Sequence, residues 1–443
     1  MKRKQFFATI AAASLGSVGG YGFGKLRAAD KPATGGAAEI GLVGGLGLEE
    51  LRETYRADLF DNFLPNMDRS VIDHDYGGFM CSVDIRTGET MSTDKRAWYE
   101  GRGMWTYGFL YNNLKQDPSY LEVIRNSKDF ILKHQPQDGE FWAGSFSREG
   151  EALSGPGDIY CNLFIAEGLA QYAIASGERD YLERAKKITL DSLARYDSPD
   201  YDYHISYLAG DASPEIPGAR VLGHWMVFLI GATQILEHDS DPEIERLADR
   251  CVEAIMEHHL NPAYGLLNEG LNHDFTIPDN EFSQFAYMGH GIETLWMVMY
   301  EAVRRQDRDL FRESSDAFKR HVTVAQDAVY GGYFRSLDHV DDYTWKVDKV
   351  LWLQEEVLIG SMILIEHMND PWARERFAET YSYVRKTFKR PGYKFWTSGG
   401  DRTLTEHNTG RAEHYHHPRH LMLNLTAVER MIERGGSVSG LFG

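Results

Sequence analysis

The sequence predicts an all-α fold, an (α/α)6 toroid with short β-hairpins on one rim. A turn that combines glycine with aromatic residues recurs at intervals of about 60 to 66 residues. Between these turns, amphipathic helical segments alternate with segments that are apolar on nearly all sides. Six such pairs can close into a ring and bury the apolar helices on both faces. A chain of 443 residues can therefore form one large domain.

Positions 1–29 have the pattern of an export signal. Three basic residues at positions 2 to 4 precede a weakly apolar run over 6–23, and small residues at 26–29 offer a cleavage site. The first basic residues resemble a twin-arginine signal in which lysine replaces one arginine, and the general secretory route fits as well. We expect a periplasmic or secreted protein that has no membrane contact after cleavage.

The composition is that of a globular protein without a nucleic-acid surface. Hydrophobic residues make up 42% of the chain and aromatic residues 12%, which is enough for a large core. The formal net charge of -19 excludes binding to nucleic acid or anionic membranes through a basic surface. Cys81, Cys161 and Cys251 are too widely spaced for a zinc knuckle or a disulfide framework, so we expect buried thiols.

After a Gly/Ala-rich lead-in at 30–47, six copies of outer helix, hairpin and inner helix fill a single domain at 48–434, and a flexible tail follows at 435–443. The expected outer helices, each with one apolar stripe, are 48–66, 119–134, 180–197, 241–259, 306–322 and 372–388. The expected inner helices, apolar beyond their first turn, are 96–113, 157–176, 218–237, 285–304, 348–368 and 413–433. Hairpins are expected near 75–79, 138–142, 201–210, 264–267, 330–334 and 392–396.

Polar residues open these otherwise apolar inner helices. In a closed toroid every inner helix starts on the same rim, so the polar residues converge there. Burying a charge is costly, which makes a set of ionisable residues at such positions a candidate functional site. The candidates are Trp98, Glu100, Arg102, Tyr160, Asn162, His224, His290, Glu293, Trp352, Gln354, Glu355, Glu356 and the run from His414 to His420.

The stretch 413–421 places four histidines and an arginine at one helix start. Histidine titrates near neutral pH and also binds metals, so the stretch indicates proton chemistry or a metal site. A metal would use His416 and His420, at i and i+4, together with Glu356. Supporting or surface roles are expected for the other histidines, which are His414, His417 and, without a metal, His420.

Four short motifs follow one another on the inner-helix starts. They are Trp-x-x-Gly-Arg-x-x-Trp at 98–105, Gly-His-x-x-Glu at 289–293, Trp-x-Gln-x-Glu at 352–356 and aromatic-His-x-Pro-Arg at 415–419. In this order they resemble the N-acylglucosamine 2-epimerase superfamily, with its cellobiose 2-epimerase and aldose-ketose isomerase relatives. The resemblance spans nearly all of the chain after the export signal, and it too implies an (α/α)6 barrel.

The resemblance implies an isomerase that acts on a small sugar without a cofactor or a metal. It implies His290 and His416 as the acid and base, assisted by Arg102, Glu293 and Glu356. Contacts to the sugar are expected from His224, Trp98, Trp352, Tyr415, Arg419, Tyr160 and Asn162. We expect a monomer or homodimer.

The chemistry agrees with two histidines facing one substrate. Inverting carbon 2 of a reducing sugar requires removal of the proton next to the aldehyde and return of a proton to the opposite face. His290 and His416, on the fourth and sixth inner helices, can flank the sugar in this way. If one histidine instead moves the proton to carbon 1 on the same face, the product is a ketose. Both outcomes are open.

Purely structural interpretations also fit these residues. Arg102 fits a salt bridge, Glu293 a plain helix pair, and His224 a satisfied core histidine. Glu355 and Glu356 point about 100° apart on their helix, so only one faces inward, and the family pattern selects Glu356. Stacking on a sugar and packing in the core are both open for Trp98, Trp142, Trp352, Trp396 and Tyr415.

Two other functions fit the same toroid, because a fold does not fix a function. One is a glycoside hydrolase or polysaccharide lyase. A hydrolase would place two carboxyls, such as Glu293 and Glu356, on either side of the glycosidic bond, but this leaves the histidines unexplained. The other is a sugar-binding protein without turnover.

Overall fold

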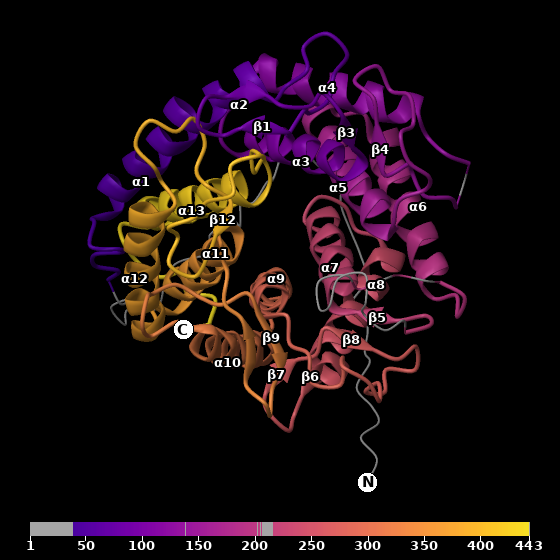
Figure 1. Cartoon of the computed structure of the whole chain (residues 1–443). Coiled ribbons are helices and arrows are strands. Elements are labelled where there is room, and N and C mark those ends of the chain that lie inside the picture. Colours follow the sequence, from indigo (N-terminus) through magenta and orange to yellow (C-terminus); the bar gives the residue numbers. More distant parts are fainter. Residues whose placement is uncertain (1–38, 138, 202, 204, 206–215, 443) are drawn as a thin grey trace, which may run out of the picture.

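The helices form a closed ring of two layers (Figure 1). The computed structural model describes residues 39–442 except 138, 202, 204 and 206–215. The inner layer consists of α3 (Ala97–Asn113), α5 (Ile159–Ser176), α7 (Leu222–Leu236), α9 (Met288–Arg305), α11 (Leu351–Met368) and α13 (His416–Glu433). The outer layer consists of α1 (Leu48–Arg56), the π-helical turn η1 (Ala57–Phe63), α2 (Leu64–Ser70), α4 (Pro118–Lys133), α6 (Arg179–Tyr196), α8 (Pro242–Glu253), its π-helical end η3 (Ala254–His259), α10 (Arg308–Ala325) and α12 (Pro371–Thr387).

Contacts between the inner helices close the ring. Each inner helix contacts the next one along the chain, and α13 contacts both α11 and α3. Helix α1 packs on α13, so the first and last of the described helices meet (Figure 1). The structure confirms the predicted toroid, in which residues far apart in sequence come to lie on one rim.

Three outer helices, α4, α8 and α12, begin with a capping aspartate followed by a proline. In α8, Asp241 accepts hydrogen bonds from the backbone N–H groups of Glu243 and Ile244 at 2.9 and 3.2 Å. Pro242 fits in the first turn, where no backbone donor is needed. The buried stripe of α8 consists of Ile244, Leu247, Ala248 and Cys251. Cys81, Cys161 and Cys251 are all free and buried, as predicted.

Short antiparallel strand pairs link neighbouring repeats at the starts of the inner helices. Three of the pairs join a strand that precedes one inner helix to a strand that precedes the next. These are β3 (Lys95–Arg96) with β4 (Ser145–Phe146), β5 (Arg220–Val221) with β8 (Gly270–Leu271), and β11 (Lys349–Val350) with β12 (Gly399–Gly400). The strands take up residues that the sequence assigns to helix, so α7 and α11 begin at Leu222 and Leu351 rather than at 218 and 348.

Only some of the predicted glycine and aromatic turns form hairpins. The turn at 264–267 lies in the hairpin of β6 (Leu260–Asn261) and β7 (Leu266–Leu267), as expected. The turns at 75–79 and 330–334 close as single bridges, Ile72–Phe79 and Gln326–Tyr333. Two longer hairpins follow them, β1 (Val83–Asp84) with β2 (Glu89–Thr90) and β9 (Ser336–His339) with β10 (Thr344–Lys346). Parts of the expected hairpins at 138–142 and 201–210 lie outside the described residues.

A buried ion-pair cluster of Asp73, Lys95 and Arg148, here called a charge lock, fixes the turn at 75–79. Lys95 Nζ lies 2.9 Å from Asp73 Oδ2 and donates to the backbone oxygen of Gly77 at 2.6 Å. Arg148 donates to both oxygens of Asp73 at 2.9 Å. Burial raises the pKa of Asp73, but the bonds from Arg148 and Lys95 outweigh it and lower that pKa to about 2. The same arrangement recurs around the turn at 330–334, with Asp327, Lys349, Gly331 and Arg402.

The two ends of the described chain pack together. The backbone N–H of Ile40 donates to the oxygen of Gly436 at 2.7 Å. A flexible tail was expected at 435–443, but Phe442 stacks on Phe311 of α10 with ring centroids 4.3 Å apart. The backbone N–H of Ser439 also donates to the oxygen of Glu366 at 2.9 Å, so the segment is anchored at more than one point. The expected export signal at 1–29 lies outside the described residues. Within the described part, no helix has both the length and the apolar character to cross a membrane.

We predict that Asp73→Ala lowers the free energy of unfolding by about 3 to 5 kcal/mol, because it leaves the buried Lys95 ammonium without its counter-charge. Urea unfolding measures the change. The matched control is Asp191→Ala, which removes an exposed helix pair with Lys187 and costs about 0.5 kcal/mol or less. Equal losses in the two variants would show that the lock contributes no more than a surface pair.

Candidate active site

The starts of α9, α11 and α13 bring the two predicted catalytic histidines to one aromatic ring. The Trp352 ring centroid lies 6.1 Å from that of His290 and 5.3 Å from that of His416. The His290 side chain is 16% exposed and that of His416 is 9% exposed, while most of their neighbours are fully buried. Both imidazoles are therefore within reach of a small molecule at the rim.

Arg419 joins the starts of three inner helices. Its Nη2 donates to Glu356 Oε1 of α11 at 2.6 Å and also bonds Glu293 Oε1 of α9. The side chain is only 1% exposed, so the pairs are shielded from water. Trp296 adds a hydrogen bond from Nε1 to Glu356 Oε2 at 2.6 Å. Glu293 and Glu356 thus hold an arginine between them.

His416 is fixed by the same group. Its Nδ1 lies 3.0 Å from Glu356 Oε1 and 3.1 Å from Arg419 Nη2. Burial lowers the pKa of His416 to about 3; the Glu293 charge opposes this shift and the Arg419 charge adds to it. The ring is therefore neutral at pH 7. When its Nδ1–H donates to Glu356, the lone pair on Nε2 is free to accept a proton.

His290 has the opposite electrostatic setting. Its Nδ1 lies 2.9 Å from Oε1 of Glu269, a fully buried carboxylate just before β8. Burial lowers the pKa of His290, but the negative charge of Glu269 and its hydrogen bond outweigh burial and raise that pKa above its usual value. The sequence interpretation missed Glu269. The signal was present as a lone acid within the apolar run at 266–271.

Arg102 offers a positive charge that no described carboxylate neutralises. Its guanidinium lies over the rings of Phe164 at 4.2 Å, Tyr415 at 4.7 Å and Trp98 at 5.5 Å. Among the described residues it takes part in no ion pair, so the salt-bridge interpretation of Arg102 has no support. Tyr415 donates to Glu167 at 3.1 Å, and the guanidinium groups of Arg102 and Arg419 lie 4.7 and 4.8 Å from the centre of its ring.

His224 lies among tyrosine rings of α5, α6 and the following loop. Its ring centroid is 4.6 Å from that of Tyr160 and 4.5 Å from that of Tyr203. Neither ring nitrogen has a hydrogen-bond partner among the described residues, and burial holds the pKa of His224 well below its usual value. The Tyr160 hydroxyl also lacks a described partner.

Asn162 stands apart from this group. Its Oδ1 accepts from the backbone N–H of Trp142 at 3.2 Å, and its Nδ2 donates to the backbone oxygen of Glu140 at 3.1 Å. Both ends of the amide therefore hold the loop before α5. Trp142 is itself buried and donates to the backbone oxygen of Ile131 at 3.1 Å, so it belongs to the core.

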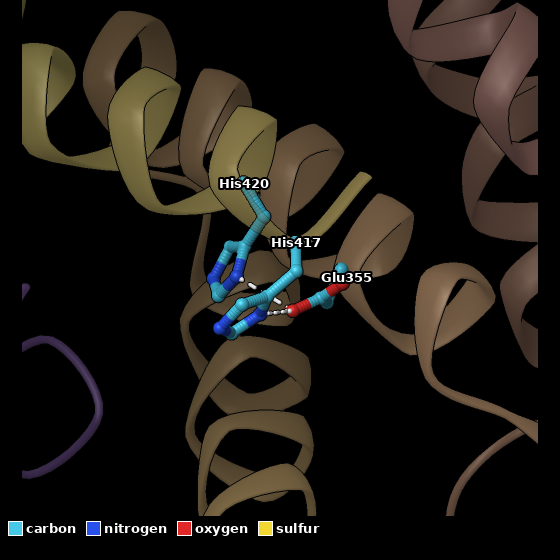
Figure 2. Close-up of side chains that lie close together, drawn as sticks. All are labelled: Glu355, His417 and His420. Carbon is cyan, nitrogen blue, oxygen red and sulfur yellow. Dashed lines mark hydrogen bonds and ion pairs between the residues drawn. The ribbon is translucent and has the colours of Figure 1, made fainter. Parts of the chain in front are cut away.

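The remaining histidines of the run are buried, which the sequence interpretation left open. His414 Nε2 lies 2.9 Å from the backbone oxygen of Tyr99. His417 and His420 turn towards Glu355, as Figure 2 shows. Glu355 and Glu356 therefore point to different histidines, as expected for helix neighbours, but both are buried. The metal set of His416, His420 and Glu356 is not assembled, because its two histidines face different carboxylates.

Two clusters of described residues have the composition of a metal site. The first, Glu293, Glu356 and His416, already holds the Arg419 guanidinium at its centre. A cation there would repel that charge, so this cluster fits a charge network better than a metal. The second is Glu355, His417 and His420.

Comparisons with known proteins agree with this fold. The family model described as N-acylglucosamine 2-epimerase (GlcNAc 2-epimerase) matches residues 77–418. The N-acylglucosamine 2-epimerase of Bos taurus is 23% identical over 371 residues, which are 78% of this chain and 84% of that protein. The cellobiose 2-epimerase of Bacteroides fragilis is 23% identical over 380 residues, covering 80% of this chain and 92% of that protein.

Solved structures share the fold at lower identity. The cellobiose 2-epimerase from Spirochaeta thermophila superposes with a TM-score of 0.73 and 18% identity, over 87% of this chain and 98% of that one. A D-mannose isomerase gives a TM-score of 0.67 and 14% identity, over 86% of this chain and 97% of that one. At these identities the likeness concerns the toroid itself.

We predict that Glu269→Gln lowers the pKa of His290, because it removes the carboxylate that favours the charged imidazole. His290 then loses its proton at a lower pH than in the native protein. NMR titration of the imidazole signals measures the shift, with Glu281→Gln at an exposed position as the control. An unchanged His290 titration in Glu269→Gln would contradict the assigned pairing.

Proposed function

The chain belongs to the N-acylglucosamine 2-epimerase family, and on this premise we propose that it is an isomerase that inverts carbon 2 of a reducing sugar. The observation that carries the proposal is the pair of histidines beside Trp352, whose pKa values are shifted in opposite directions. Two groups with separated pKa values can act as base and acid at the same pH.

The proposed reaction runs on the ring-opened sugar. His416, neutral at pH 7, takes the proton from carbon 2, and the electron pair of the broken C–H bond forms an enediolate. Arg102 faces the negative oxygen, and a fixed cation at such a position stabilises the transition state. Protonated His290 then gives its proton to the opposite face of carbon 2, which forms the new C–H bond. Glu269 supports this role by favouring the charged form of His290.

The surrounding residues support the same chemistry. Glu356 holds the His416 ring by accepting a hydrogen bond from Nδ1–H, which leaves the lone pair on Nε2 for the sugar. Trp98 and Trp352 are partly exposed and offer ring faces to the substrate. His224 and Tyr160 contribute polar atoms that lack described partners, which a sugar hydroxyl can satisfy.

The alternative enzymes have weaker support. A ketose product requires one histidine to serve carbons 1 and 2 on the same face, whereas two histidines on separate helices favour inversion. A glycoside hydrolase would need Glu293 and Glu356 on either side of a glycosidic bond. Both carboxylates instead bond one nitrogen of Arg419, so they are close together and already paired.

We predict that His290→Asn and His416→Asn each slow proton exchange at carbon 2 by about 100-fold or more, since each removes a proton-transfer group. The assay incubates the protein with glucose, mannose, N-acetylglucosamine and cellobiose in deuterium oxide and follows carbon 2 by NMR. His74→Asn, at an exposed position, is the control and keeps the native rate.

The products separate the possible functions. Deuterium at carbon 2 together with the epimer supports the proposal, and a ketose indicates isomerisation instead. New reducing ends from an oligosaccharide, without exchange, would replace the proposal with hydrolysis. Native exchange in either active-site variant would contradict the assigned acid and base.

We also propose that residues 1–29 direct export to the periplasm or beyond. In a Gram-negative host, we predict a mature chain that begins near Asp30, which N-terminal sequencing of the periplasmic fraction detects. Changing both Arg3 and Lys4 to glutamine blocks export by the twin-arginine route, and unchanged export in that variant indicates the general secretory route. An uncleaved chain in the cytoplasm would contradict the export proposal.

A further inference from the structure

A second carboxylate and histidine cluster lies behind the proposed active site. Glu355 comes from α11, and His417 and His420 come from α13, one turn apart (Figure 2). Their exposed fractions are 0%, 3% and 2%. The proposed reaction uses none of the three. Three ionisable side chains without contact to water are costly unless they bind one another or a ligand.

The three side chains direct their ligand atoms to one point. Glu355 Oε1 lies 2.5 Å from His417 Nδ1 and 3.3 Å from His420 Nδ1. One ligand atom from each residue fits within 4.8 Å of the others. Donor atoms bound to a tetrahedral zinc ion at about 2.0 to 2.1 Å lie about 3.4 Å from each other. The His420 contact already has this spacing, and the His417 contact must open by about 1 Å.

One oxygen of the cluster is left unsatisfied. Both imidazoles face Oε1 of Glu355, while its buried Oε2 has no hydrogen-bond partner among the described residues. A buried carboxylate oxygen without a partner is unfavourable. A cation bound by Glu355 and the two Nδ1 atoms would satisfy the carboxylate, and a water molecule would supply the fourth donor of a tetrahedral site.

The surroundings fit a ligand role for the histidines. His420 Nε2 lies 3.2 Å from the Tyr55 hydroxyl, which Asn424 also bonds at 3.1 Å. A metal-bound histidine commonly uses its other nitrogen in such a bond, which fixes the ring. The His417 ring packs on Phe63 at 5.6 Å and on Trp396 at 4.6 Å. These aromatic rings cover the His417 side of the cluster.

The charge around the cluster also distinguishes it from the active site. Glu293, Glu356 and His416 surround the Arg419 guanidinium. Among the described residues, the ion-pair partners of Glu355 are His417 and His420, and no arginine or lysine is one of them. A divalent cation would therefore meet one carboxylate and two neutral rings, in which each proton moves from Nδ1 to Nε2.

We propose that Glu355, His417 and His420 bind one divalent transition-metal ion, with zinc as the best match to two imidazoles and a carboxylate. The ion joins α11 to α13 directly behind Glu356 and His416. This site is independent of the proposed reaction and does not require the sugar specificity to be known.

The test measures metal in the full chain produced with zinc in the medium and dialysed against metal-free buffer. We expect about one zinc per chain by elemental mass spectrometry, and less than about 0.1 per chain in Glu355→Gln and in His420→Gln. Glu293→Gln, in the neighbouring cluster, and His321→Gln, at another buried histidine, keep the metal. Circular dichroism verifies that each variant is folded.

A second measurement covers the case in which a variant fails to fold. Cobalt(II) added to the native chain after removal of zinc gives the intense visible absorption of a four-coordinate site, saturating at one equivalent. A folded native chain that contains no zinc and gives no such absorption would overturn the proposal. Zinc that persists in folded Glu355→Gln or His420→Gln would also overturn it, because the ion would then lie elsewhere.

Discussion

The buried guanidinium of Arg419 is the interaction on which the site depends. It pairs with Glu293 of α9 and Glu356 of α11 from its own place on α13. Removing three charges from water is expensive, and replacing such groups with apolar residues often costs nothing in stability. The positions of Arg419, Glu293 and Glu356 explain why these charges are buried here. The arginine sets the distance between three helix starts and lies beside the His416 ring, which contacts Glu356.

The toroid supplies the conditions for this interaction. Closure of α13 on α3 buries the inner helices on both sides, which accounts for their apolar bodies. The strand pairs β3–β4, β5–β8 and β11–β12 join neighbouring inner-helix starts, so the polar first turns face one rim. The charge locks around Asp73 and Asp327 fix two of the turns that lead into these starts. The rigidity of the rim therefore comes from backbone pairing and buried charge together.

Two histidines in one site acquire different properties because their partners differ. Burial disfavours the charged form of both rings. Glu269 faces His290 at hydrogen-bond distance and favours its charged form, whereas at His416 the Arg419 charge counteracts the acidic neighbours. The protein thus obtains an acid and a base from the same residue type. A third and a fourth histidine, His417 and His420, form a separate group with Glu355, the neighbour of Glu356 on α11.

The sequence by itself determined the toroid, because the amphipathic or apolar character of each helix can be recognised within its own segment. It also placed Arg102, His290, Glu356 and His416 at inner-helix starts, since each begins an apolar run. Only the tertiary structure decided which charge faces which ring. Glu269 reaches His290 from the residue before β8, and Asn162 turns to the loop at 140–142 instead of joining the site. These pairings depend on how strands and helices from different repeats are positioned, and spacing along one segment carries no information about that.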